Sequence, residues 1–138
     1  MTSLQALVKL TRRMSRNKFE VSLEVDGAFP RELSRWAGGE LVRVLQEALN
    51  NARWHSSPRK VSVRLWREGE AVLAEVADDG KGFDPSTSGG GVGMSSMRQR
   101  ALRLGGELAI ESKPGSGTRV RFEAPIVRLL EQKNPEGD

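Results

Sequence analysis

The sequence predicts an α+β fold: a two-layer sandwich in which a mixed, mostly antiparallel sheet is covered by helices on one face. The first observation is the length of 138 residues, which suits one hydrophobic core. The second is the order of the segments, which reads helix, strand, helix, helix, strand, strand, helix, strand, strand. The third is that neighbouring strand-like segments are joined by short turns, so that hairpins dominate.

Four segments are expected to be helical because their apolar residues recur at helical spacing. The longest has a single apolar stripe and stops before Pro58, a usual end signal. The short helix before it is expected to close at Gly38 and Gly39. The four segments are residues 3–16, 31–37, 40–55 and 94–104.

Five segments are expected to be strands because apolar and polar residues alternate in them, or because they are short apolar runs. The run over residues 71–76 is almost wholly apolar, which suits a central strand. Regular structure is expected to end near Arg128, followed by a polar, frayed tail. The strand segments are residues 19–25, 61–65, 71–76, 108–110 and 118–124.

Composition excludes several classes of site. The chain has no cysteine and a single histidine, His55, which excludes disulfides, thiolate metal sites and multi-histidine metal sites. No apolar run approaches the roughly 20 residues of a membrane span. The net charge is +4, but the basic residues are dispersed apart from one cluster over residues 12–18 that has no interleaved aromatic residue. A solvated helix face is therefore favoured over nucleic-acid binding.

The first candidate motif lies on the long helix. Glu47, Asn51 and His55 are four residues apart, so all three lie within about 80° of arc and form a polar stripe beside the apolar one. Oxygen ligands suit Mg²⁺, which keeps several of its waters, so this stripe is a candidate for holding hydrated Mg²⁺ and phosphates. The alternative is an ordinary solvated helix edge.

The second motif is the run Asp78-Asp79-Gly80-Lys81-Gly82, directly after the apolar strand. A carboxylate at a strand end can accept a hydrogen bond from an exocyclic amine, while glycine backbone approaches a flat base. The alternative is a plain Asp-Gly turn. A nucleotide site is favoured because the chain continues into a long glycine-rich loop.

The third motif is Gly89-Gly90-Gly91-Val92-Gly93-Met94, which runs directly into a helix. Backbone N–H groups at such a helix start can face an anion, helped by the helix dipole. No Gly-Lys-Ser/Thr follows, so the motif is not a P-loop, and no strand precedes it as in a dinucleotide-binding fold. Alone, it is equally typical of a flexible linker.

In combination and in this order, the motifs resemble the ATPase superfamily of DNA gyrase, the heat-shock chaperone ATPases, MutL and the histidine kinases. Residues 46–52 resemble its N box, residues 76–83 its G1 box and residues 89–94 its G2 box. The segments over residues 97–101, 104–108 and 112–118 look like those of sensor kinases paired with LuxR-type response regulators. The resemblance covers roughly residues 20 to 125 and implies a Bergerat-type ATP-binding fold.

The resemblance also implies roles for individual residues. Asn51 would coordinate Mg²⁺, Glu47 would orient or deprotonate the attacking group or position a Mg²⁺-bound water, and His55 would reach the phosphates. Where the family usually has Lys or Arg three residues after this Asn, the chain has Trp54, and Arg53 or Lys60 are the candidate substitutes.

The base and the phosphates would be held by the other two motifs and the last strand. Asp78 would bind the adenine amino group, assisted by Thr118, with Gly80 and Gly82 giving room for the base. The G2 residues would form the lid hinge and phosphate contact, and the lid, about residues 84–92, would be short. These G2 residues are Gly89, Gly91, Gly93 and Met94.

The implied reaction is transfer of the γ-phosphoryl group of ATP to a histidine in two-component signal transduction. Residues 1–17 are expected to be the remnant of a dimerisation and acceptor hairpin, 18–127 the catalytic domain and 128–138 a flexible tail. The apolar face of the first helix is expected to be open for docking that hairpin, and His55 is not favoured as the acceptor. The expected partners are this hairpin and a LuxR-type response regulator, with no nucleic acid and no membrane insertion, in the cytoplasm.

Two other functions fit part of the pattern. An anti-sigma-factor-type serine kinase shares the superfamily, but the C-terminal hairpin and the short lid argue against it. A degenerate scaffold that binds no nucleotide is supported by Trp54 alone, and the retained Glu47, Asn51 and Asp78 argue against it.

Overall fold

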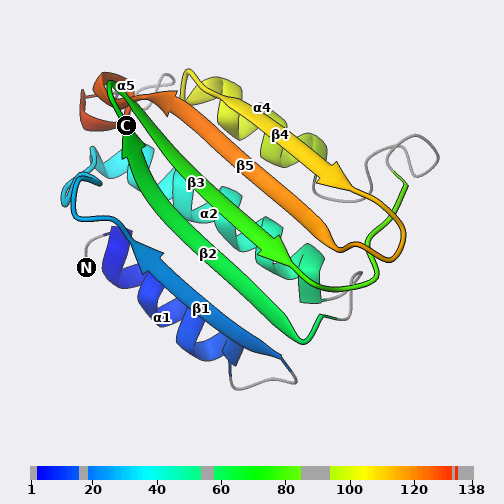
Figure 1. Ribbon diagram of the computed structural model, residues 1–138. Helices are drawn as coiled ribbons and strands as arrows, with labels where there is room; N and C mark the ends of the chain where they lie inside the picture. The colour runs from blue at the N-terminus through cyan, green and yellow to red at the C-terminus, as the bar shows by residue number, and fades with distance from the viewer. Residues whose placement is uncertain (1–2, 16–18, 54–57, 85–93, 132, 134–138) are drawn as a thin grey trace.

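The computed structural model describes residues 3–15, 19–53, 58–84, 94–131 and 133. These residues form the predicted α+β fold, with one sheet and a layer of helices (Figure 1). The elements, in chain order, are α1 (Ser3–Ser15), β1 (Glu20–Val25), α2 (Arg35–Asn51), β2 (Lys60–Glu68), β3 (Ala71–Asp78), α4 (Met94–Arg103), β4 (Glu107–Ser112), β5 (Thr118–Pro125) and α5 (Ile126–Glu131).

The five strands form a single mixed sheet in the order β1-β2-β3-β5-β4. Only the β1–β2 pair is parallel, and the other three pairs of neighbouring strands are antiparallel. The apolar run predicted to be central is β3, which has a neighbour on each side. Its residues from Val72 to Val76 are all buried, which explains why its sequence lacks a clear alternation.

Helices α1, α2 and α4 lie on one face of the sheet (Figure 1). The core lies between the two layers, where the buried side of α2 meets alternate residues of the strands, such as Val63, Val76 and Phe122. The predicted two-layer arrangement is therefore confirmed. Among the described residues, no helix combines the length and apolar character that a membrane span requires.

Helix α1 is part of this core. Leu7 and Leu10 are 2% and 7% exposed and pack in the same cluster as α2 and the sheet. The expectation that the apolar face of this helix is open for docking is therefore wrong for these two residues. Their partners are elements that follow α1 in the same chain, and periodicity alone cannot show where a partner comes from.

One prediction about the helices was wrong. Residues 31–37 and 40–55 were expected to be separate helices with a break at Gly38-Gly39, but α2 runs continuously from Arg35 through both glycines. Ser34 caps its start, since the Ser34 hydroxyl accepts a hydrogen bond from the Ala37 N–H at 3.1 Å. Gly38 is buried inside the helix, so packing against the core outweighs the low helix propensity of glycine.

The end of regular structure was also placed too early. The tail was expected to begin at Arg128, but α5 continues to Glu131. Leu129 is fully buried, and its carbonyl accepts a hydrogen bond from the Ser34 N–H at 2.7 Å. This contact fixes α5 beside the start of α2, a long-range interaction that the local sequence IVRLLE does not reveal.

The face of the sheet opposite the helices is covered by charged and aromatic side chains. Glu75 is only 5% exposed there, and the Arg121 guanidinium donates two hydrogen bonds to its carboxylate, at 3.1 and 2.8 Å. The contact with Glu75 raises the pKa of Arg121. Arg121 and Arg64 also lie over the Trp66 ring, so these long side chains shield the central strand from water on its outer face.

Candidate functional site

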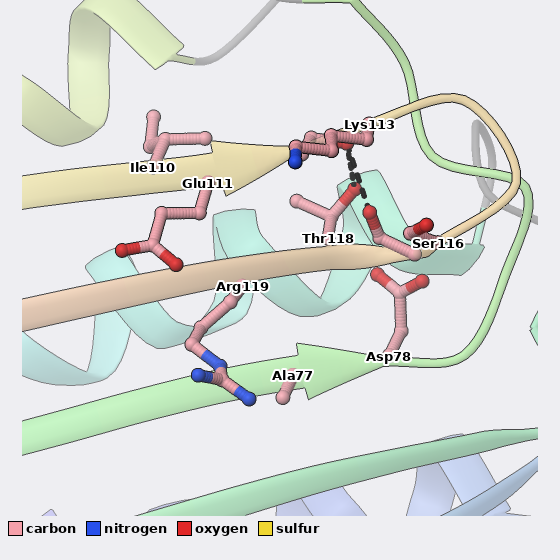
Figure 2. A pocket seen from close by; sticks show the side chains of 10 residues that line it. Ala77, Asp78, Ile110, Glu111, Lys113, Ser116, Thr118 and Arg119 are labelled. Atoms are coloured by element: carbon pink, nitrogen blue, oxygen red, sulfur yellow. Dashed lines mark hydrogen bonds between the residues drawn. The ribbon is translucent and has the colours of Figure 1, made fainter.

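The predicted adenine-binding residues lie at one end of the sheet, where β3 ends and β5 begins. Asp78 and Thr118 are directly opposite one another in the β3–β5 pairing. Both side chains line a hollow of about 500 Å³, together with residues of the β4–β5 turn such as Lys113 and Ser116 (Figure 2). Two residues that are 40 positions apart in the sequence are thus brought together. The prediction that Thr118 assists Asp78 requires this proximity.

The two adjacent aspartates of the G1 motif have different tasks. Asp79 accepts hydrogen bonds from the backbone N–H groups of Arg59 and Lys60, both at 2.9 Å, and so fixes the start of β2. These bonds, that from Lys60 foremost, lower the pKa of the Asp79 carboxyl, against a smaller opposing effect of burial. Asp78 points into the hollow instead, and its Oδ1 accepts the Gly80 N–H at 2.8 Å. This bond orients the Asp78 carboxylate.

Ser112 belongs to the site, although the sequence indicated it only as the first residue of the motif over residues 112–118. Its Oγ accepts the Phe83 N–H at 2.9 Å and donates to the Gly117 carbonyl at 2.9 Å. The 2.9 Å contact between the Ser112 and Thr118 hydroxyls must then use the Thr118 proton, because a hydroxyl has only one proton to donate. Thr118 therefore has only acceptor capacity left for a ligand.

Glycines in the G1 turn and in the β4–β5 turn allow the backbones of these two turns to lie in contact. Gly82 has a φ of +63°, and a Cβ there would collide with the backbone carbonyls of Lys113 and Gly117. Gly117 has a φ of +75°, and a Cβ there would collide with the Asp78 carbonyl. Glycine at position 82 thus has a packing reason of its own, beside the expected room for a base, because the two backbones touch at this point.

Helix α2 brings the N-box residues to the same end of the molecule. Its C-terminal end lies behind the end of β3 (Figure 1). Glu47 and Asn51 are half-buried, one turn apart. The Asn51 Nδ2 is buried without a hydrogen-bond partner in the described part of the chain. An unsatisfied buried amide is costly, so this group calls for an acceptor that a ligand can provide.

Of the third motif, residues 89–94, the structure describes Met94. Met94 begins α4 and is buried, as expected for a residue that fixes the end of the G2 loop to the core. Four residues proposed for phosphate and lid contacts lie outside the described residues, as does most of the predicted lid and Trp54. These four are His55, Gly89, Gly91 and Gly93.

The donor set fits Mg²⁺ held largely by phosphate and water. Within the described residues, no three acidic, histidine or cysteine side chains converge on a possible metal position. Glu47 and Asn51 supply one carboxylate and one amide oxygen on successive turns, which suits a cation that takes few protein ligands. The unpaired Asn51 Nδ2 also fits a neighbouring phosphate oxygen, since phosphate supplies only acceptors.

Taken together, this end of the fold presents hydrogen-bond acceptors at the strand ends and an unpaired amide on the helix. The acceptors, Asp78 and Thr118, suit a ligand edge with an N–H₂ group. The Asn51 amide suits an anionic group of the same ligand that lies away from its N–H₂ edge. A ligand with an amino-bearing ring and a phosphate chain meets both demands.

Residues 38–128 match the family described as histidine kinase-, DNA gyrase B- and HSP90-like ATPases. This match spans more than half of the chain, so the chain belongs to that family, a class of ATP-binding domains. It covers all three motifs and the β4–β5 hairpin. The family assignment inferred from the boxes is thereby confirmed at this level.

Two relatives of this chain are sensor proteins. The chain is 36% identical over 108 residues to the sensor protein VraS of Staphylococcus epidermidis, covering 78% of this chain and 30% of that protein. It is 39% identical over 89 residues to VraS of Staphylococcus haemolyticus, covering 64% of this chain and 26% of that protein. The chain therefore spans about a third or less of the length of these relatives.

Solved structures share the fold. The histidine kinase domain of the blue-light activated kinase EL346 of Erythrobacter litoralis superimposes with a TM-score of 0.78 at 24% identity, covering 93% of this chain and 63% of that one. The histidine kinase AdeS of Acinetobacter baumannii gives a TM-score of 0.71 at 14% identity, covering 90% and 63%. At these identities the likeness is one of fold.

Proposed function

We propose that this chain binds Mg-ATP and donates the γ-phosphoryl group to a histidine that lies outside residues 1–138, as the catalytic part of a two-component sensor kinase. The observation that supports this function best is that Asp78 and Thr118, opposite each other in the sheet, offer only hydrogen-bond acceptors to a ligand. The proton of the Thr118 hydroxyl is already used in the contact with Ser112. Family membership and the sensor-protein relatives support the same function.

Each residue has a proposed task. Asp78 and Thr118 accept the two N–H bonds of the adenine amino group, and Gly80 orients Asp78 through its N–H. Asn51 contributes its amide oxygen to Mg²⁺ and its amide N–H₂ to a phosphate oxygen. Glu47, one turn away, orients the attacking imidazole or a Mg²⁺-bound water.

The remaining tasks rest on the resemblance to the family. Gly89, Gly91 and Gly93 contact the phosphates through backbone N–H groups, and Met94 fixes the end of that loop. His55 reaches the phosphates from the last turn of the N box. Bound Mg²⁺ supplies charge neutralisation, and the rest of the catalysis is positioning, as is general for phosphoryl transfer.

The proposed partners follow from the sensor relatives and from the C-terminal hairpin. The acceptor histidine belongs to a dimerisation hairpin, and residues 1–17 are proposed to be the end of its helical connection. The phosphoryl group then passes to a response regulator of the LuxR type, in the cytoplasm. The relatives favour the histidine-kinase function over the serine-kinase alternative, since their names denote sensors.

Calorimetry with Mg-ATP, Mg-ADP and adenosine tests the site. Asp78→Asn should weaken all three ligands by about tenfold or more, because it removes a charge-assisted hydrogen bond to the adenine amine. Asn51→Ala should remove the Mg²⁺-dependent part of ATP affinity and leave adenosine within about twofold. Saturating Mg-ATP should also raise the melting temperature by several degrees.

Asp79→Asn is the matched control. It alters the neighbouring aspartate, whose carboxylate binds the backbone of Arg59 and Lys60, so ATP affinity should stay within about twofold of the unmodified chain. Equal loss of adenosine in the folded Asp78→Asn and Asn51→Ala variants would refute the division of tasks. No nucleotide binding at all would leave the scaffold function standing.

A further inference from the structure

Ser112 connects three segments at the nucleotide end of the fold through hydrogen bonds. Its Oγ accepts the N–H of Phe83, the last residue of the G1 box, and donates to the carbonyl of Gly117 in the β4–β5 turn, both at 2.9 Å. The Thr118 hydroxyl lies 2.9 Å from the same oxygen. Ser112 is opposite Thr118 in the β4–β5 pairing, and Thr118 is opposite Asp78 in the β3–β5 pairing. Thr118 therefore lies between Ser112 and Asp78 in one row across three strands.

The hydrogen-bonding capacity of Ser112 is fully used. A serine hydroxyl has one proton and two lone pairs. The proton goes to the Gly117 carbonyl, which can only accept, and one lone pair takes the Phe83 N–H, which can only donate. The contact with Thr118 takes the remaining lone pair. The proton of the Thr118 hydroxyl is therefore directed at Ser112 and not at a ligand.

Packing holds the two groups that set this direction. Gly117 has a φ of +75°, and a Cβ there would collide with the Asp78 carbonyl, so the β4–β5 turn lies in contact with the end of β3. Phe83 packs against the hydrophobic core. For Thr118 to turn its proton toward a ligand, Ser112 would lose that bond or give up its own bond to Gly117. Either change leaves a part-buried polar group with one hydrogen bond fewer.

A threonine hydroxyl of fixed direction can distinguish bases that a freely rotating one cannot. Adenine has an N–H₂ group at ring position 6, where hypoxanthine has a carbonyl oxygen. A free hydroxyl accepts from the first and donates to the second. The Asp78 carboxylate alone does not decide, since hypoxanthine can offer it the ring N–H beside that carbonyl. Asp78 and Thr118 border the same hollow, so Thr118 is the group that can reject a carbonyl oxygen (Figure 2).

We propose that Ser112 is a positioning residue that makes the site selective for a base with an amino group over a base with a carbonyl oxygen. It acts through Thr118, whose proton it holds. The Thr118 oxygen then meets an N–H₂ group as an acceptor, and meets a carbonyl oxygen with a lone pair that repels it. This inference rests on the proposed function, because the base must lie against Asp78 and Thr118.

Calorimetry with Mg-ATP and Mg-inosine triphosphate tests the inference on the whole chain. The two ligands differ only in the base, so the ratio of their dissociation constants separates base selection from phosphate binding and from partial unfolding. The unmodified chain should bind inosine triphosphate at least about tenfold more weakly than ATP. Ser112→Ala releases the Thr118 proton, which can then be donated to the carbonyl oxygen. The ratio should fall by about fivefold, the effect of one neutral hydrogen bond.

A double-mutant cycle tests whether the effect passes through Thr118. Thr118→Val has no hydroxyl proton to release, so adding Ser112→Ala to it should change the ratio by less than about twofold. A fall of the same size in the valine background would show a general structural effect and overturn the proposal. Ser112→Cys serves if Ser112→Ala does not fold, since a thiol nearly keeps the size of the side chain but is a weak acceptor.

Ser62→Ala is the matched control, because it removes a strand serine that does not line the hollow, and it should keep the ratio of the unmodified chain. ATP binding with an unchanged ratio in Ser112→Ala would overturn this inference and leave the proposed function intact. The same holds if the unmodified chain binds both ligands equally. Absence of ATP binding by the unmodified chain would overturn the proposed function and this inference together.

Discussion

At the scale of single residues, Gly82 shows why the chain needs glycine where the two turns of the site meet. Its positive φ is unfavourable for any other residue, and a Cβ would also collide with the carbonyls of Lys113 and Gly117. The second effect is specific to this fold, because those carbonyls belong to the β4–β5 turn. A single carbon atom added at position 82 would therefore push the turn after β3 away from the β4–β5 turn.

We expect Gly82→Ala to lower the free energy of unfolding by more than about 2 kcal/mol, because the collision adds to the backbone strain. Gly69→Ala is the matched control: Gly69 has a φ of +58°, but nothing lies within 4 Å of a Cβ there, so only the backbone term of about 1 kcal/mol remains. Urea denaturation measures both variants. Equal losses would show that the turns can separate without cost.

Asp79 gives a pH-dependent prediction. Its pKa is lowered in the folded chain by the N–H groups of Lys60 and Arg59, so its stabilising effect is present above the unfolded pKa and is lost as the pH falls through the folded pKa. We expect Asp79→Asn to be modestly less stable than the unmodified chain from pH 5 to 8. The difference should shrink below about pH 4. Urea titrations at each pH measure it, and a difference that persists at pH 3 would contradict the assignment.

At the scale of elements, α2 is the helix that carries the N box, and its continuity through Gly38-Gly39 was not predicted. A glycine pair is a usual end signal, but here Gly38 is buried in the core and Ser34 caps the helix one turn earlier. The helix thus positions Glu47 and Asn51 from a start that is fixed by α5, through the bond from Ser34 to Leu129.

Gly39 is exposed in the interior of α2, and nothing lies within 4 Å of a Cβ built there. Gly39→Ala should therefore stabilise the chain by about 0.5–1 kcal/mol, the propensity difference between the two residues in a helix. Thermal denaturation, read as an upward shift of a few degrees, measures it. If the chain did break at this point, as the sequence suggests, alanine would destabilise it instead.

At the scale of the whole molecule, the question is what residues 1–138 do with ATP on their own. The chain has one histidine, His55, which the resemblance places beside the phosphates as a binding residue. We expect no acid-labile phosphorylation of this chain when it is incubated with radiolabelled Mg-ATP. An acid-labile label on His55 would refute the proposal that the acceptor lies elsewhere.

Addition of a separate acceptor hairpin from the same sensor should give slow labelling of that hairpin. Tethering in one chain supplies an effective concentration of the order of mM, which free diffusion at lower concentration does not match. Asn51→Ala should abolish the transfer, and Asp79→Asn should retain it. Label on a serine of another protein, with none on the hairpin, would move the serine-kinase alternative ahead.

The sequence by itself determined the class of fold, the five strands and the three motifs. These depend on side-chain periods of two or about 3.6 residues and on glycine and aspartate placed at element ends, and both are local properties of the chain. The pairing of Asp78 with Thr118 was implied by the resemblance, and the antiparallel β3–β5 register places them opposite each other.

Only the tertiary structure decided the points that depend on residues far apart in sequence. Ser112 becomes the centre of the hydrogen bonds at the site because Phe83, 29 residues earlier, reaches it. Leu7 and Leu10 are buried, and Leu129 fixes the start of α2, because packing joins the two ends of the chain to the middle. The hollow between α2 and α4, lined by residues such as Glu40 and Arg100, exists because two helices with ordinary polar flanks lie side by side, and no local pattern encodes that neighbourhood.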